Sequence, residues 1–295
     1  MKKLVIDEAF LSELESLQTL LKNNVAGALG GNRRSKNLGS SCEFADYRDY
    51  VPGDDVTKID WNAYARFDKL YEKLYYDERQ MHTRIYIDAS QSMGHGADEE
   101  KAEQAIRIAA AFAYLSVCEM DKVSIYVLRG GTAEEIVSGM VGKDSYLNCI
   151  NRLNAITFEG DARISEAIVP TNVGRGDGYS IILSDFLTDE NFEDAIDHLC
   201  DRKRDVLCVQ ILSREELNPQ IRGRMHLLDS EDSNRFFRKK IDGDVVRAYK
   251  EALRYVSDRV QLYCESRGAS YILVPAYVSP ADILFGQLSD MEVIK

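Results

Sequence analysis

The stretch RIYIDASQSMG, residues 84–94, decides the fold of this chain. Its first part is an apolar run typical of a strand, and the run ends in the carboxylate of Asp88. Its second part holds two serines and a Met-Gly pair, which predicts a tight turn into the next helix. Another apolar run, YSIILSD at residues 179–185, is continuous, as in strands that are covered on both faces. The sequence therefore predicts two buried strands that end in Asp88 and Asp185.

Around these two strands, strand and helix patterns alternate along the chain from residue 81. Such alternation predicts an α/β fold, with a mostly parallel sheet and helices on both of its faces. The segment 135–138, reached by a Gly-Gly turn, is expected to be an antiparallel edge strand. The other expected elements are strands at 123–128, 205–211 and 270–274, a hairpin of 225–229 and 235–239, and helices at 101–120, 145–153, 192–200 and 245–264, with shorter ones from 164 and 279.

The first 80 residues have a different texture. Asp7 can cap a helix that runs to about Asn24, because apolar residues recur there at helical spacing. Residues 43–66 are rich in Asp, Tyr and Arg, and short strands and turns are expected there. Trp61, the only tryptophan, is expected to anchor this segment on the core. We therefore divide the chain into an N-terminal module, residues 1–80, and a larger domain, residues 81–295.

The composition excludes several classes of protein. The chain has 295 residues and a net charge of −12, which makes it a poor general binder of nucleic acid or of anionic membranes. No apolar stretch is long enough for a membrane span, and the first residues do not resemble a signal peptide. The six cysteines are scattered, as expected for reduced thiols. These features predict a cytoplasmic protein.

The two aspartates are the candidate functional residues. Ligands of open parallel sheets bind outside the carboxyl ends of the strands, so Asp88 and Asp185 are expected to share one crevice. Two carboxylates that are buried together repel each other, and a divalent cation relieves that repulsion. The hydroxyls of Ser90 and Ser92 add hard oxygen donors, which suit Mg²⁺. The alternative is that Asp88 caps the following turn and the serines only form that turn.

Two motifs carry a resemblance to known families. The motif DASQSMG, residues 88–94, after an apolar strand resembles the metal-ion-dependent adhesion site (MIDAS) of von Willebrand factor A domains. The segment EFADYRDYVPGDD, residues 43–55, with IDW at 59–61, resembles the signature of the bacterial domain of unknown function 58 family. The resemblance covers nearly the whole chain. It implies a Rossmann-like von Willebrand A-type domain after a small N-terminal module, and a MoxR-type AAA+ ATPase as partner.

The resemblance also implies a set of metal ligands. Asp88, Ser90 and Ser92 correspond to ligands of Mg²⁺ or Mn²⁺, some of them through water, and Asp185 corresponds to the second carboxylate. The family pattern has a threonine where this chain has Ala162, which lacks a hydroxyl and points to a weak or vestigial site. Asp161 could supply an oxygen instead, or it could be a solvated loop charge.

The function expected from these observations is a non-enzymatic, metal-dependent protein-interaction module of the adaptor or chaperone type. An acidic side chain of a client protein would complete the coordination of the metal. The alternative is a Mg²⁺-dependent phosphohydrolase with Asp88 as nucleophile. That chemistry wants a second carboxylate two residues later, where this chain has Ser90. For residues 43–66 we favour an ion-pair network over a partner surface.

Overall fold

The computed structural model describes residues 5–24, 35–38, 44–77, 80–94, 100–176, 178–187, 191–221, 223–228 and 236–285. The chain divides into two compact units. The larger unit contains the chain up to Gln18 and from Met81 onward, and the smaller unit runs from Thr19 to Gln80. The start of the first helix, which we assigned to the N-terminal module, thus belongs to the larger unit.

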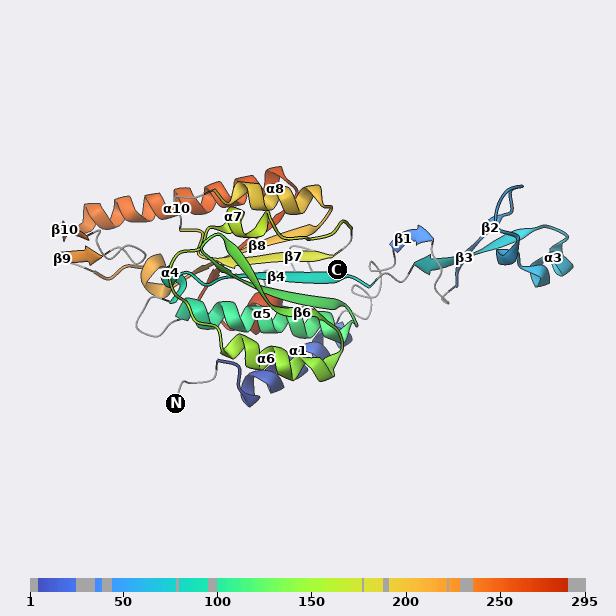
Figure 1. Ribbon diagram of the computed structural model, residues 1–295, viewed down its shortest axis with the longest axis horizontal. Helices are drawn as coiled ribbons and strands as arrows, with labels where there is room; N and C mark the ends of the chain where they lie inside the picture. Colours follow the sequence, from blue (N-terminus) through green and yellow to red (C-terminus); the bar gives the residue numbers. More distant parts are fainter. Residues whose placement is uncertain are drawn as a thin grey trace. The chain divides into compact units, whose positions relative to one another are not determined.

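The larger unit is built on a six-stranded sheet (Figure 1). Neighbouring strands are parallel, apart from β6, which pairs antiparallel with β5 at one edge. This arrangement confirms the expected α/β class and the antiparallel edge strand. In spatial order the strands are β11 (Ser270–Pro275), β8 (Asp205–Leu212), β7 (Tyr179–Ser184), β4 (His82–Asp88), β5 (Lys122–Arg129) and β6 (Thr132–Met140).

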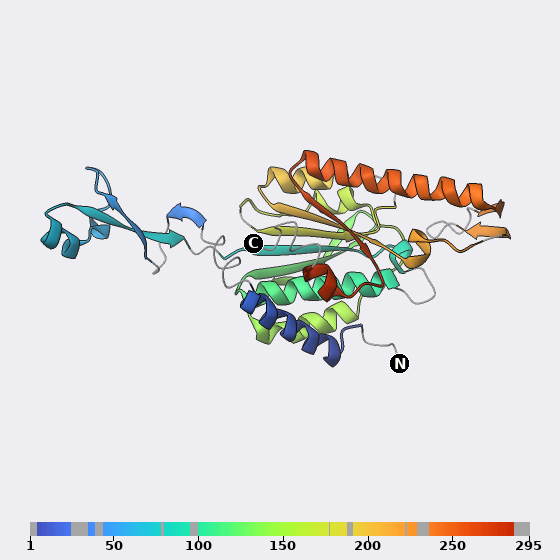
Figure 2. The ribbon, with the colours of Figure 1, turned by 180° about the vertical axis from the view of Figure 1, so that it is seen from behind.

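Helices cover both faces of this sheet, as Figures 1 and 2 show. One side carries α1 (Glu8–Asn24), α5 (Glu100–Cys118), α6 (Tyr146–Asn154) and α11 (Pro280–Phe285). The other side carries α7 (Ile164–Ile168), α8 (Glu193–Asp201) and α10 (Gly243–Ser266). In β4, Ile85 and Ile87 lie on the face opposite to Tyr86, and all three are fully buried, because helices cover both faces.

The strand order reverses at β4. The chain passes from β4 to β5 and β6 in one direction, and then returns to β7 on the other side of β4. Ile87 pairs with Leu183, so Asp88 and Ser184 end the two strands at the same level. In open α/β sheets a crevice forms at this reversal, outside the carboxyl ends of the strands. The fold therefore brings the ends of the two predicted strands together.

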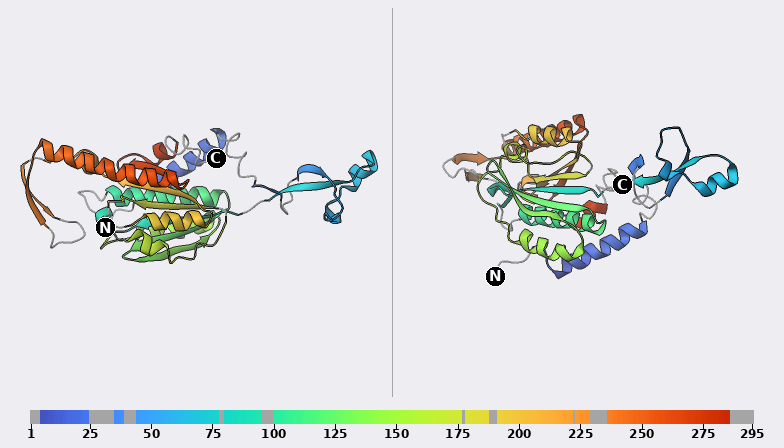
Figure 3. Two further views of the ribbon diagram at one scale, coloured as in Figure 1. Left: turned by 90° about the horizontal axis from the view of Figure 1, so that it is seen from above. Right: turned by 45° about the vertical axis from the view of Figure 1, so that its right-hand side comes forward.

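Short elements surround this end of the sheet and the start of α10. They are α4 (Gln91–Gly94), α9 (Arg214–Leu217) and the hairpin of β9 (Gly223–Leu228) and β10 (Phe236–Ile241). The short helix η2 (Lys143–Ser145) follows β6 at the opposite end of the sheet, where β4 and β5 start. The strands of this hairpin are antiparallel, as expected, and the hairpin leads directly into α10 (Figure 3). Asp242 caps α10, because its carboxylate accepts from two backbone N–H groups of the first turn. None of the described helices is long and apolar enough to cross a membrane.

The smaller unit has a three-stranded antiparallel sheet in the order β1 (Ser35–Leu38), β3 (Tyr71–Asp77), β2 (Phe44–Asp49). It also contains η1 (Val56–Lys58) and a seven-residue helix, α3 (Trp61–Phe67). Ion pairs join its segments, since Arg48 binds both Glu72 and Asp54, and Lys73 lies 3.3 Å from Asp60.

Two expectations for this unit were wrong. The segment 61–67 is a helix, and it starts there because Asp60 accepts from the backbone N–H groups of Asn62 and Ala63. Trp61 is not an anchor on the core, because 62% of its surface is exposed. No residue of α3 is buried, so the helix lies on the outside of its small sheet.

Candidate functional site

Asp88 is the last residue of β4 and is 4% exposed. Its Oδ1 accepts from the backbone N–H of Ser90 at 2.9 Å, and its Oδ2 accepts from Oγ of Ser184 at 2.6 Å. Burial, and then the charge of Asp185, raise the pKa of Asp88 to about 6, although these hydrogen bonds act in the opposite direction. Asp88 is therefore a buried carboxylate in an environment that opposes its ionisation.

The two predicted serines lie directly beside Asp88. Ser90 is buried, Ser92 is half-buried, and their Oγ atoms are 2.9 Å apart. The loop before α7 closes over this turn, because Gly160 O accepts from the N–H of Gln91 at 2.8 Å. The structure thus brings together Asp88, Ser90 and Ser92 as the sequence predicted, and they make hydrogen bonds to one another and to Ser184.

Asp185 follows β7 and has a partner that we did not predict. Its Oδ2 lies 2.8 Å from Nζ of Lys101, and its Oδ1 accepts from the N–H of Leu187 at 3.0 Å. Lys101 stands in the first turn of α5 and is 2% exposed. Its ammonium also lies 2.6 Å from Oε1 of Glu216. A buried Lys101 thus bridges two carboxylates, and one of them is a predicted metal ligand.

Glu216 is held in place by α9. Its Oε2 accepts from the N–H of Ser213 at 2.7 Å, while Ser213 Oγ accepts from the N–H of Glu216, which is a complete capping box. Burial by itself lowers the pKa of Lys101, but the two carboxylates outweigh it, and the pKa is raised. Lys101 therefore remains a charged ammonium inside the protein.

The sequence contained a signal for this residue. Lys101 precedes Ala105 and Ala109 at intervals of four, on the side of α5 that is fully buried. A cationic side chain at such a position must find a buried anion. Its partners, Asp185 and Glu216, are so distant from Lys101 in the sequence that residue spacing could not predict them.

Asp161 is not part of the buried cluster. Its side chain is exposed, and its carboxylate lies 3.4 Å from Nε of Arg163. Its backbone carbonyl accepts from the N–H of Gly130, which positions the loop but leaves the side chain at the surface. Ala162, at the threonine position of the family pattern, packs its methyl group into the core.

The donors do not fit the ligand set that the resemblance implies. Mg²⁺ requires six oxygen ligands at close to ideal octahedral geometry. Here both oxygens of Asp88 already accept hydrogen bonds, Asp185 binds an ammonium, and Asp161 pairs with Arg163. Within the described ranges, no three His, Cys, Asp or Glu residues are grouped so that they could hold a metal ion. The residues present, in the arrangement that the structure shows, therefore do not fit the Mg²⁺ or Mn²⁺ ion that the resemblance implies.

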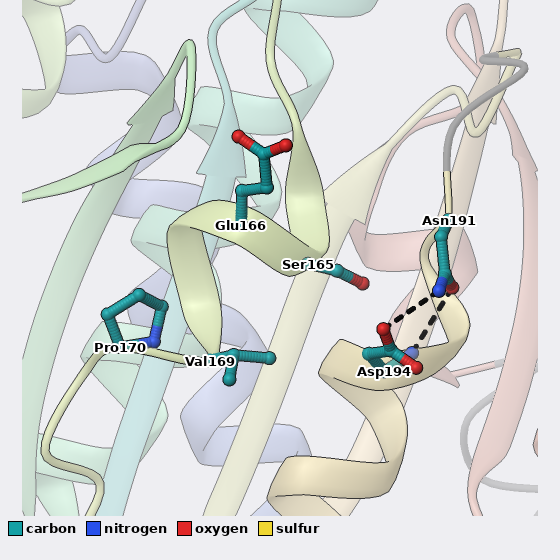
Figure 4. Close-up of a pocket in the computed structure, with 6 residues that line it drawn as sticks. All are labelled: Ser165, Glu166, Val169, Pro170, Asn191 and Asp194. Carbon is teal, nitrogen blue, oxygen red and sulfur yellow. Dashed lines mark hydrogen bonds between the residues drawn. The ribbon is translucent and has the colours of Figure 1, made fainter.

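A separate pocket of about 630 Å³ lies between α7 and the start of α8 (Figure 4). Asn191 and Asp194 bind each other across its rim, and Ser165 Oγ accepts from the N–H of Ala195. Its polar groups thus serve the fold. The lining residues are Ser165, Glu166, Val169, Pro170, Asn191 and Asp194.

Comparisons with known proteins give the family. Two uncharacterized proteins, from Mycobacterium bovis and Mycobacterium tuberculosis, are each 24% identical over 230 residues, covering 76% of this chain and 72% of the relative. A solved aerotolerance-related membrane protein from Bacteroides fragilis is 15% identical, with a TM-score of 0.40 over 72% of this chain and 99% of that one. The VWA domain of SpRpn10 is 10% identical, with a TM-score of 0.38 over 71% and 95%. Residues 46–258 match the sequence model of the family described as "Protein of unknown function DUF58", and the chain belongs to that family.

Proposed function

We propose that this chain is a protein-interaction module that docks a partner protein at the surface around the carboxyl ends of β4 and β7. The observation that carries this proposal is Asp88, a buried carboxylate with a raised pKa at the reversal of strand order. Perturbed carboxylates of this kind cluster at functional sites, and α/β sheets bind ligands at this place.

This surface offers groups for such a contact. Gln91 and Leu187 are exposed, and Ser92 is half-buried. An amide and a hydroxyl can bind backbone groups of a partner, and Leu187 adds apolar area. A partner carboxylate, which we expected from the sequence, would meet the carboxylates of Asp88, Asp185 and Glu216 here, and the Lys101 ammonium already binds two of them. A partner segment that donates hydrogen bonds needs no bound cation.

A MoxR-type AAA+ ATPase is the proposed partner, because the family resemblance implies it. The test is a pulldown of the MoxR-type ATPase encoded nearest in the host genome, with wild type, Gln91→Trp and Asn148→Trp. Both substitutions place an indole on an exposed helical position, but only Gln91 lies at the carboxyl ends of β4 and β7. We expect Gln91→Trp to weaken binding at least about tenfold, roughly 1.4 kcal/mol, while Asn148→Trp binds like wild type. Equal binding by both variants would rule out this surface as the interface.

A second docking surface is favoured by an independent observation in the smaller unit. Trp61 and Phe67 on α3 are 62% and 66% exposed, and Tyr64 between them is also exposed. Arg66 lies on the same helix. Exposed aromatic clusters beside an arginine are typical of the centres of protein interfaces. A pocket of about 540 Å³ beside this face is lined by Tyr47, Asp60, Asn62, Ala63, Arg66, Phe67 and Tyr71.

The aromatic face is tested by Trp61→Ala in the same pulldown. Because the side chain is exposed, we expect the free energy of unfolding to change by no more than about 0.5 kcal/mol. Partner binding is expected to fall at least about tenfold if this face docks the ATPase. If Trp61→Ala and Gln91→Trp both bind like wild type, the proposed function fails for both surfaces.

A further inference from the structure

We infer that Lys101 is the resident cation at the carboxyl ends of β4 and β7: its ammonium stands beside Asp185 where the family pattern leads one to expect a divalent metal ion, so this chain needs no metal there. The inference concerns the same end of the sheet as the proposed function, but it does not depend on any partner. Lys101 lies outside the DASQSMG motif, residues 88–94.

The geometry supports a built-in counter-ion. Lys101, Asp185 and Glu216 come from three separate elements: α5, the end of β7, and α9. The Nζ atom lies 2.8 Å from Asp185 and 2.6 Å from Glu216, which uses two of the three N–H donors of the ammonium. The side chains of Lys101 and Asp185 are almost completely buried. Charge-assisted hydrogen bonds of this length hold all three elements together.

The arrangement also explains why a metal ion would have to compete. A divalent ion at Asp185 would have to displace the ammonium from Oδ2, and would leave a buried cation without its partner. At Asp88 it would meet a carboxylate whose two oxygens each already accept a hydrogen bond, from the N–H of Ser90 and from Oγ of Ser184. The missing hydroxyl at Ala162 removes one ligand that could compensate. The expected cation and the observed ammonium are therefore alternatives at the same carboxylate.

This exchange can be tested by removing the ammonium. Lys101→Met keeps an unbranched apolar side chain of similar length but leaves Asp185 and Glu216 without a cation. We expect Mg²⁺ or Mn²⁺ to raise the melting temperature of Lys101→Met by about 5 °C or more at a hundredfold excess over Kd. The control variant Lys250→Met loses an exposed lysine on α10. For this variant, and for the wild type, we expect the melting temperature in Mg²⁺ to equal the melting temperature in EDTA.

A double variant locates the metal. Lys101→Met combined with Asp185→Asn is expected to lose the response to Mn²⁺, because the carboxylate that binds the ion is gone. A folded Lys101→Met protein that melts identically with and without Mn²⁺ would overturn the inference.

The wild type provides a measurement that does not depend on the folding of any variant. Mn²⁺ is titrated into the wild-type chain and followed by electron paramagnetic resonance, which reports free Mn²⁺. We expect no saturable site with a Kd below about 1 mM, which is the weak end of the range for protein sites that bind hard divalent cations. One equivalent of tightly bound Mn²⁺ that is lost in Asp88→Asn would overturn the inference. These measurements use the chain alone and test only the inference about Lys101. Their outcome is therefore independent of the partner pulldown, which tests the proposed function.

Discussion

The ammonium nitrogen of Lys101 lies 2.8 Å from Oδ2 of Asp185, although the two residues are 84 positions apart in the chain. Their contact joins the start of α5 to the end of β7, and Glu216 extends it to α9. Both charges are removed from water, so neither can be lost alone without leaving the other uncompensated. The stability of this end of the sheet should therefore depend on the pair.

Asp185→Asn is predicted to be strongly destabilising. It leaves the buried Lys101 with only Glu216, and breaking a buried ion pair costs about 3–5 kcal/mol. The matched control is Asp258→Asn, because Asp258 forms an exposed pair with Arg254 on α10 and such pairs contribute about 1 kcal/mol or less. Unfolding in urea measures both free energies. If the two substitutions cost the same, the Lys101 pair does not stabilise the protein.

Gly178 provides a second prediction, because a side chain has no room there. A Cβ atom at this position would lie 2.5 Å from the carbonyl oxygen of His82, and the residue has a φ of +138°. Gly178→Ala is therefore predicted to lower the free energy of unfolding by more than about 4 kcal/mol, because the methyl group would push the backbone of β4 away from the start of β7.

Gly176 is the control for Gly178. It has a similar φ of +122°, but a Cβ atom there would meet nothing within 4 Å. Gly176→Ala should cost only the conformational strain, about 1–2 kcal/mol. Chemical denaturation of both variants separates the two effects. A similar loss of stability in both would mean that φ alone decides the cost.

Apolar runs allowed most of the larger unit to be predicted. A strand that is buried on both faces, such as 179–184, is recognised in the sequence as a continuous apolar run. The alternation of strand and helix patterns likewise predicts the parallel sheet. The meeting of Asp88 and Asp185 followed from this, because parallel strands end at the same edge. Lys101 did not follow, since no local pattern tells which carboxylate a buried helix residue will reach.

The smaller unit was harder to predict for a different physical reason. It has little core, so its residues are arranged by capping and ion pairs more than by apolar periodicity. The capping residue Asp60 was the available signal for α3, a helix too short to show a repeating face. Trp61 was expected to be buried because tryptophan is mostly apolar, but this unit offers it no interior.

The stability of the protein is predicted to fall in acid through His82. Burial, and then the positive charges of Arg84 and Arg204, lower the pKa of His82 to about 4, below its ordinary value of about 6.5. Between these two values the unfolded chain binds the proton and the folded chain does not, so stability is lost as the pH falls from 6.5 towards 4.

The variant His82→Gln isolates this contribution. Glutamine cannot take up a proton, but it retains a group that can bind Oγ of Ser124, as the His82 ring does at 3.0 Å. Urea unfolding at several pH values should give a shallower loss of stability for His82→Gln between pH 6.5 and 4. Parallel curves for wild type and variant would show that His82 does not titrate differently on folding.

The last prediction separates a binding module from an enzyme. A phosphohydrolase would use Asp88 as a nucleophile, but this residue is 4% exposed and both of its oxygens accept hydrogen bonds. Ser90 stands where the chemistry requires a second acid. We therefore expect the wild type and Asp88→Asn to hydrolyse p-nitrophenyl phosphate in Mg²⁺ at the same background rate. Asp161→Asn is the control, because this aspartate is at the surface. Turnover that Asp88→Asn abolishes and Asp161→Asn retains would establish the enzymatic alternative and refute a purely binding role.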